Sequence, residues 1–325
     1  MAEPSIEMIE ASAARARVRE ACDRLLRLGG VRDAVRHHGF SFHDGAVHYI
    51  EAGGGQPVVL IHGAGGGCAN WYRLIGPIAA RYRVLAPDLP GFGESDAVAP
   101  HPPLGAQAAA RLGTWLDATA SPPWILVGTS FGGLAALRLA QARPADVRAV
   151  VLVDVVGVGT SLPLLVRLAA MRRLRGVLLR PSRRGTALLF RLLLTSNRDG
   201  IAPDHEQALI DYLHAADMAG GAAQLEATLA HFASWQGQRE VLTAAELATL
   251  PMPVLVAWGE RDRFVPVSDA RSAASALPRA ELRILEDAGH SPNWEAAEEL
   301  TTAVLQFLDR LPRAVPSVRS GDTRA

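Results

Sequence analysis

The segment GTSFGG, residues 128–133, most constrains what this chain can fold into, because it places a serine between glycines where a strand turns into a helix. The apolar run WILV before it is typical of a buried strand, and the run LAALRLA after it is typical of a helix. Gly128, Ser130 and Gly132 fit the pattern G-x-S-x-G, in which a sharp turn presents the serine at the end of the strand. Strand and helix approach each other closely in such a turn, so side chains larger than glycine would collide. Ser130 is therefore the candidate nucleophile.

The rest of the chain alternates strands with helices, which predicts an α/β fold with a parallel sheet covered on both faces. Strands such as PVVLI and VRAVVLV alternate with helical segments up to about residue 155, and the alternation resumes near residue 246. Between these points the pattern indicates helices alone. The predicted parts are an N-terminal helical extension at 1–40, a core at 41–155 and 246–311, a helical cap insertion at 156–245, and a flexible tail at 312–325.

The composition argues against several classes of function. The formal net charge is zero, so no overall field favours a nucleic-acid partner. All the basic residues are arginines, which excludes a lysine nucleophile or Schiff base. Two cysteines, Cys22 and Cys68, cannot form a disulfide framework, and residues 1–20 mix Glu and Arg where a secretory signal would be apolar. No apolar run reaches the length of a membrane span. We expect a cytoplasmic protein that needs no cofactor.

A serine hydroxyl needs a base to take its proton, and the loop EDAGHSPNWE offers one. His290 lies there between a strand and the last helix, at the same sheet edge as Ser130. Asp262, in GERDRFVP, follows the preceding strand and would orient the imidazole. Asp154, at the end of VRAVVLVD, is a rival acid. The longer loop around Asp262 can turn its carboxylate inward, so we favour Asp262.

The loop after PVVLI, HGAGGG at residues 62–67, predicts an oxyanion hole. Its glycines let the backbone approach a substrate carbonyl, and we expect the N–H of Ala64 to donate there, with Gly63 and Gly65 as alternatives. The second donor is the N–H of Phe131, the residue after the nucleophile. The loop lacks the spacing of phosphate-binding loops, so we do not expect a nucleotide here.

Five motifs in this order, HGAGGG, DLPGFGESD, GTSFGG, GERDRFVP and AGHSPNWE, resemble the α/β-hydrolase superfamily, in the branch with a helical cap after the sixth strand. The resemblance covers about residues 41–311 and implies a mostly parallel eight-stranded sheet flanked by helices. It implies Ser130 as nucleophile, Asp262 as acid and His290 as base. Haloalkane dehalogenases and epoxide hydrolases of this branch have aspartate at the nucleophile position, so the serine at position 130 argues against both activities. GTSFGG resembles the carbon–carbon bond hydrolases of aromatic ring cleavage, but many of those have tryptophan where Ser291 stands here.

These features predict a serine hydrolase that cleaves a carboxylic ester, or a related acyl bond, of a small hydrophobic substrate. Two alternatives stay open. One is a carbon–carbon bond hydrolase acting on meta-cleavage products or β-diketones with the same triad. The other is a non-hydrolytic member of the fold, namely an acyltransferase, a cyclase or a ligand receptor.

Eight arginines lie between residues 167 and 191 of the predicted cap, interleaved with leucines and valines. They indicate amphipathic helices with a solvated face. Alternatively, one of them binds an anionic substrate group, or the basic surface rests on an anionic membrane. The N-terminal extension packs on the body or forms a homodimer. His37-His38 lacks further ligands in the sequence, so we expect no metal site.

Overall fold

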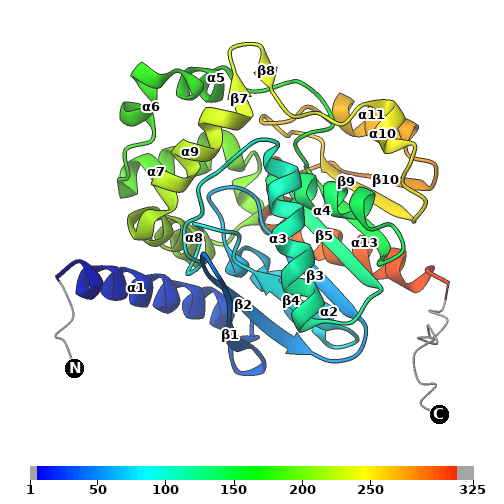
Figure 1. Cartoon of the computed structure of the whole chain (residues 1–325), viewed down its shortest axis with the longest axis horizontal. Helices are drawn as coiled ribbons and strands as arrows, with labels where there is room; N and C mark the ends of the chain where they lie inside the picture. Colours follow the sequence, from blue (N-terminus) through cyan, green and yellow to red (C-terminus); the bar gives the residue numbers. More distant parts are fainter. Residues whose placement is uncertain (1–5, 313–325) are drawn as a thin grey trace.

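The computed structural model describes residues 6–312, so the predicted flexible tail lies outside the described residues apart from Pro312. Eight strands form one sheet in the order β1-β2-β4-β3-β5-β6-β9-β10 (Figure 1). The pairs β1–β2 and β2–β4 are antiparallel and all others are parallel. The predicted mostly parallel eight-stranded sheet is confirmed. The strands are β1 (Arg36–Phe42), β2 (Gly45–Gly53), β3 (Pro57–Ile61), β4 (Arg83–Pro87), β5 (Trp124–Thr129), β6 (Val147–Val153), β9 (Val254–Gly259) and β10 (Ala280–Leu285).

Helices cover both faces of the sheet. Successive residues of a strand point to opposite sides, and in the central strands both sets of side chains are apolar and must be buried. In β5, Leu126 belongs to one apolar core and Ile125 and Val127 to the other. The first core lies under α3, α4 and α11, and the second under α1, α2, α8 and α13. Outside the cap the helices are α1 (Ile6–Leu28), η1 (Arg32–Ala34), η2 (Cys68–Trp71), α2 (Tyr72–Ala79), α3 (Leu104–Thr119), α4 (Phe131–Ala142), α10 (Ala244–Leu247), α11 (Val267–Ala276), α12 (Pro292–Glu295) and α13 (Ala297–Asp309).

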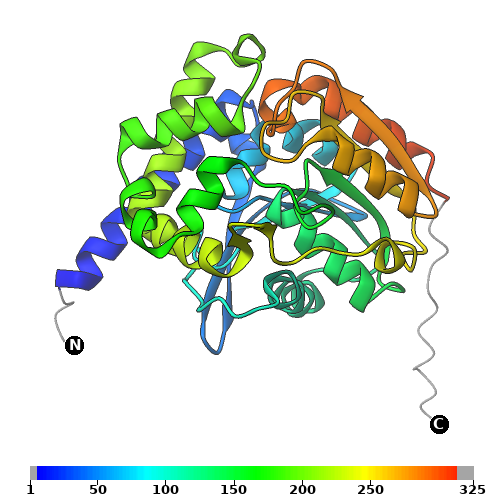
Figure 2. The same cartoon turned by 90° about the horizontal axis from the view of Figure 1, so that it is seen from above.

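The predicted helical extension at 1–40 is wrong at its end. Helix α1 stops at Leu28, and residues 36–40 belong to strand β1, which pairs with β2 along its whole length. Local sequence did not reveal this because the strand is defined by its partner: residues 36–42 pair with residues 45–51 in a hairpin that turns at His43 and Asp44. Helix α1 packs against α8 and η2 and lies beside the cap (Figure 2).

The segment between β6 and α10 folds over the carboxyl end of the sheet. The expectation of helices alone fails at one place, a two-stranded hairpin of β7 and β8. None of the described helices combines the length and the apolarity needed to cross a membrane. The elements of this segment are α5 (Leu164–Ala170), α6 (Arg172–Leu178), α7 (Arg183–Leu189), η3 (Phe190–Leu194), η4 (Arg198–Gly200), α8 (Pro203–Ala216), η5 (Asp217–Gly221), α9 (Ala222–Phe232), β7 (Ala233–Ser234) and β8 (Gly237–Gln238).

Candidate active site

Ser130 occupies a strained turn between β5 and α4. Its φ is 49° and its ψ is −121°, a region that residues other than glycine rarely adopt. The flanking glycines make this turn possible: a Cβ on Gly128 would lie 2.6 Å from the carbonyl oxygen of Gly132. A Cβ on Gly132 would lie 2.3 Å from the carbonyl oxygen of Ile61, in the neighbouring strand β3. The two glycines thus allow close approach both to the following helix and to the next strand, and backbone strain is stored at the serine.

His290 and Asp262 meet at the carboxyl end of the sheet. His290 Nδ1 donates to Asp262 Oδ2 over 2.8 Å, since a carboxylate can only accept. The other carboxylate oxygen, Oδ1, accepts from the backbone N–H groups of Phe264 at 2.6 Å and Val265 at 3.0 Å. The ring of Phe264 stacks on the imidazole with centroids 4.6 Å apart. This arrangement holds the imidazole in the tautomer whose Nε2 has a free lone pair.

Asp154, the rival acid, makes a different set of contacts. Its side chain is fully buried, and Oδ1 accepts from the backbone N–H of Gly259 at 2.9 Å. Its Oδ2 has no hydrogen-bond donor among the described residues. Burial, together with the charge of Asp262, raises the pKa of Asp154 well above its usual range. A neutral Asp154 beside Asp262 is a poor partner for an imidazolium, and the hydrogen bond to His290 belongs to Asp262.

The predicted oxyanion loop lies against the serine. Gly63 is so close that a Cβ on it would lie 2.9 Å from the Cβ of Ser130. Ala64 and Phe131 both line the cavity above Ser130. His62, to which sequence reasoning gave no role, holds this loop in place. Its Nδ1 donates to the carbonyl oxygen of Gly63 at 2.7 Å, and its Nε2 accepts from the N–H of Leu89 at 2.7 Å.

The loop that carries His290 is fixed by Glu295, which sequence reasoning also missed. Its buried carboxylate accepts from the backbone N–H of Gly289, the residue before His290, at 3.1 Å. It also accepts from the N–H groups of Ser196 at 2.7 Å and Asn197 at 2.6 Å, which belong to the cap. One carboxylate therefore ties the loop that carries His290 to the cap. Only the folded arrangement reveals this role, because these residues are about 100 positions apart in the sequence.

A cavity of about 200 Å³ lies between the cap and the sheet, and both Ser130 and His290 line it. Its walls are mostly apolar. Among the described residues that line it there is no arginine, so the cap arginines lie elsewhere. The lining includes one acid, Asp217, whose Oδ2 accepts from Thr186 Oγ1 at 2.9 Å. Burial raises the pKa of Asp217 to about 6. Apolar walls are contributed by the cap residues Leu165, Leu178, Leu189, Leu193, Leu225 and Phe232.

Trp294 lies four residues beyond His290 and faces the same cavity. It is buried, stacks on Phe190 of the cap with ring centroids 5.4 Å apart, and donates through Nε1 to the carbonyl oxygen of Asn70 at 3.0 Å. Ser291 also lines the cavity. The tryptophan thus joins cap and core at this point, and the position after His290 carries a small side chain.

Comparison with known proteins finds relatives over most of the chain. The family model described as alpha/beta hydrolase fold matches residues 56–297. A 2-hydroxy-6-oxo-6-phenylhexa-2,4-dienoate hydrolase of Burkholderia cepacia is 31% identical over 276 residues, which cover 81% of this chain and 91% of that relative. A crystal structure of a membrane phospholipase A has a TM-score of 0.74 and 26% identity, over 94% of this chain and 93% of that one. The structure of the 2-hydroxy-6-oxo-6-phenylhexa-2,4-dienoate hydrolase of a Rhodococcus strain, RHA1, has a TM-score of 0.73 and 25% identity, over 85% of this chain and 99% of that one.

Proposed function

Because the chain belongs to the α/β-hydrolase family, we propose that it is a serine hydrolase that cleaves uncharged, apolar carboxylic esters. In this proposal Ser130 is the nucleophile, His290 the base and Asp262 the acid that orients it. Phe131 and Ala64 donate the backbone N–H groups of the oxyanion hole. The reaction proceeds through an acyl-enzyme on Ser130 Oγ.

The observation that carries this proposal is the chemistry of the cavity wall. A substrate carboxylate buried in an apolar pocket needs a cation or several donors. The described lining residues include no arginine, and they do include Asp217, which is mostly ionised at neutral pH with a pKa of about 6. Such a wall repels an anion and accepts a hydrocarbon chain. A neutral ester with an apolar acyl group fits it better than a dienoate.

The proposed steps follow from the contacts of the three residues. His290 Nε2 takes the proton of Ser130 Oγ as this oxygen attacks the ester carbonyl carbon. Asp262 stabilises the imidazolium through its bond to Nδ1. The oxyanion accepts from the two backbone N–H groups, an effect worth about 10²–10³ in rate for each donor. The imidazolium then protonates the leaving alkoxide, and water activated by His290 releases the acid.

Carbon–carbon bond hydrolysis is a second candidate, and the sequence relatives favour it. The 31% identical Burkholderia cepacia protein is named as a dienoate hydrolase. In that reaction a carbon acid leaves in place of an alcohol, and the same three side chains would serve. The absence of an arginine among the described lining residues counts against a substrate that carries a carboxylate.

A direct comparison of the two substrate classes tests the proposal. We expect measurable hydrolysis of p-nitrophenyl esters, with kcat/KM rising from acetate to longer acyl chains because the wall is apolar. We expect kcat/KM for 2-hydroxy-6-oxo-6-phenylhexa-2,4-dienoate to be lower by at least tenfold. A higher kcat/KM for the dienoate than for the esters would make carbon–carbon cleavage the function. Labelling of Ser130 by a fluorophosphonate without turnover of either substrate class would favour acyl transfer.

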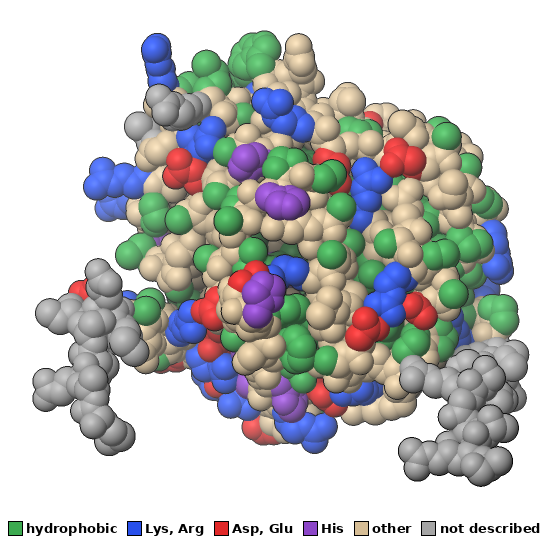
Figure 3. Space-filling model, viewed as in Figure 1, with side chains coloured by type: hydrophobic (Ala, Val, Ile, Leu, Met, Phe, Trp, Pro, Cys, Tyr) green, Lys and Arg blue, Asp and Glu red, His purple; other side chains and the backbone are tan. Residues whose placement is uncertain are grey.

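We further propose that the cap rests on an anionic lipid surface from which apolar esters reach the cavity. Residues 167–191 contain eight arginines and no acid. Arg173, Arg180 and Arg184 are exposed and make no ion pair within the described part of the chain. Blue and green side chains lie next to one another along the upper left edge of Figure 3, the region of α5–α7. Eight large hydrophobic side chains among the described residues are exposed, and seven of them lie in the cap, between β6 and α10: Leu164, Met171, Leu174, Leu188, Leu192, Met218 and Trp235.

A further inference from the structure

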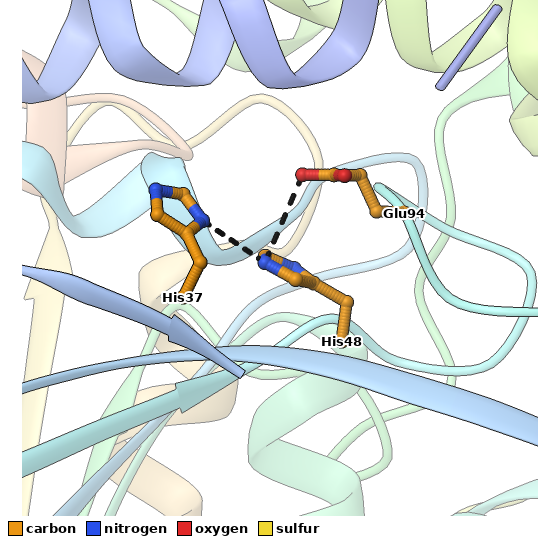
Figure 4. A group of neighbouring side chains, drawn as sticks. All are labelled: His37, His48 and Glu94. Atoms are coloured by element: carbon orange, nitrogen blue, oxygen red, sulfur yellow. Dashed lines mark hydrogen bonds and ion pairs between the residues drawn. The ribbon is translucent and has the colours of Figure 1, made fainter. Parts of the chain in front are cut away.

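A second group of polar side chains lies outside the cavity, where α1 crosses the hairpin of β1 and β2. His37 comes from β1, His48 from β2 and Glu94 from the loop after β4, and the three point toward one place (Figure 4). His37 Nδ1 lies 3.0 Å from His48 Nε2, and Glu94 Oε1 lies 3.7 Å from the same Nε2. Their side chains are 10%, 8% and 11% exposed. This cluster takes no part in the proposed hydrolysis.

The outer nitrogens of both imidazoles already carry their protons. His37 Nε2 lies 3.2 Å from Asp23 Oδ1, and His48 Nδ1 lies 2.7 Å from Asp88 Oδ2. Carboxylates only accept, so each of these ring nitrogens donates. In neutral imidazoles the two inner nitrogens are then both unprotonated, and their lone pairs face each other. Glu94 adds a third acceptor. Such a convergence of acceptors needs either a proton or a metal cation among them.

The charges around the cluster also favour a cation. Three carboxylates, those of Asp23, Asp88 and Glu94, surround the two imidazoles. Two guanidinium groups neutralise two of these charges. Arg32 Nε lies 2.6 Å from Asp23 Oδ1, and Arg19 donates to both carboxylate oxygens of Glu94. The group therefore has one uncompensated negative charge when both histidines are neutral. Arg19 leaves Glu94 Oε1 with a second lone pair for a ligand, since a carboxylate oxygen has two.

We propose that His37 Nδ1, His48 Nε2 and Glu94 Oε1 bind a zinc ion, with water as the fourth ligand. In tetrahedral zinc sites the ligand atoms lie roughly 3.3–3.5 Å apart. The distances from His48 Nε2 to the other two ligand atoms, 3.0 and 3.7 Å, lie on either side of this range, and all three atoms lie within 4.8 Å of one another. Histidines that bind metals nearly always donate their other N–H to a carboxylate or carbonyl, and here both do. Two imidazoles, one glutamate carboxylate and a water are a donor set that zinc takes in proteins.

The site fastens the N-terminal helix to the body of the protein. His37 and His48 precede residue 56, where the match to the family model begins, and Glu94 lies within the matched residues, so the site joins the two parts of the chain. Asp23, on α1, holds His37, and Glu94 belongs to the loop that follows β4. His37-His38 has no further ligand nearby in the sequence, because strand pairing supplies it. Gly39 pairs with His48, which places His48 on the same face of the hairpin as His37.

Zinc binding to the full chain tests this proposal. The protein is stripped with EDTA and titrated with zinc chloride by calorimetry, and Tm is followed at increasing zinc concentration. We expect one equivalent to bind, and Tm to rise with the logarithm of zinc concentration, as for any ligand that binds only the folded state. His37→Gln and Glu94→Gln should each weaken binding by at least about tenfold.

His38→Gln is the matched control, because His38 is the next residue of the same strand and stacks on Tyr49 instead. It should bind zinc as the wild type does. Circular dichroism checks that His37→Gln and Glu94→Gln are both folded. A folded variant that no longer binds zinc has lost a ligand and does not have a folding defect. No binding by the wild type, or equal binding by His37→Gln, would overturn the site and leave a shared proton between the imidazoles. The zinc titration can also be made with Ser130→Ala, which should bind zinc as the wild type does. The result of the titration is therefore independent of the proposed hydrolysis.

Discussion

Asp262 and His290 belong to two different loops, and their side chains meet through a 2.8 Å hydrogen bond between Oδ2 and Nδ1. Asp262 has no remaining freedom, because two backbone N–H groups hold its other oxygen. The pair is therefore preorganised, and both Ser130 and His290 line the same cavity. No hydrogen bond joins Ser130 Oγ to His290 in the part of the chain that the structure describes. Catalytic contacts of this kind commonly tighten when substrate binds.

Replacing the proposed nucleophile, Ser130, should abolish turnover. Ser130→Ala removes the oxygen that carries the acyl group in the proposed reaction, so we expect kcat to fall by several orders of magnitude. Intact mass after fluorophosphonate treatment should show one adduct in the wild type and none in this variant. Ser291→Ala is the control, because Ser291 lines the same cavity and should leave the adduct in place. A variant at Ser130 that retained more than a tenth of the activity would remove this serine from the mechanism.

The two candidate acids can be separated by matched amide substitutions. Asp262→Asn should lower kcat/KM by roughly 10⁴, because the amide would favour the wrong tautomer of His290. Asp154→Asn should cost less than about tenfold, since burial and the charge of Asp262 already keep the Asp154 carboxyl neutral through its raised pKa. Steady-state kinetics with one ester measure both effects. If Asp154→Asn were the more damaging change, the acid would have been assigned to the wrong strand.

Ionisation of Asp217 should make stability depend on pH. Its folded pKa of about 6 lies above its ordinary value of 3.8, because burial disfavours the charge. The folded state therefore binds the proton more tightly, and this contribution is present below about pH 4 and lost as pH rises through 6. The wild type should lose up to about 3 kcal/mol more stability than Asp217→Asn between pH 4 and pH 8. Urea unfolding measures this difference. The exposed Asp287, changed to Asn, should show no such divergence from the wild type.

The cap surface should bind anionic membranes. We expect the protein to sediment with vesicles that contain phosphatidylglycerol but not with pure phosphatidylcholine, and the association to weaken as salt increases. Arg180→Glu/Arg184→Glu should remove most of the binding, because each basic residue near such a surface contributes about 1 kcal/mol. The control Arg271→Glu/Arg279→Glu makes the same charge change on exposed residues outside the cap. If both double variants lost vesicle binding equally, the net charge of the protein alone would explain the binding. That result would count against a specific binding surface on the cap.

Much of the site could be predicted because its signals are local. Ser130 and its glycines lie within five residues, and the turn they form is required by close backbone approach. His290 and Asp262 each follow a strand, and parallel strands bring their carboxyl ends to one edge of the sheet. Segments that depend on a distant partner were less predictable. Residues 36–40 read as helix until β2 is seen to pair with them.

The sequence by itself determined the alternation of strands and helices in the core, the serine turn and the loops that carry the candidate base and acid. These follow from residue periodicity and from the space that glycine leaves, both of which are local properties. The tertiary structure alone decided that His290 bonds to Asp262 and not to Asp154. It also decided that no arginine is among the described residues lining the cavity, and that His48 and Glu94 meet His37. Such outcomes depend on strand register and on the direction of side chains from segments far apart, which no single stretch of sequence contains.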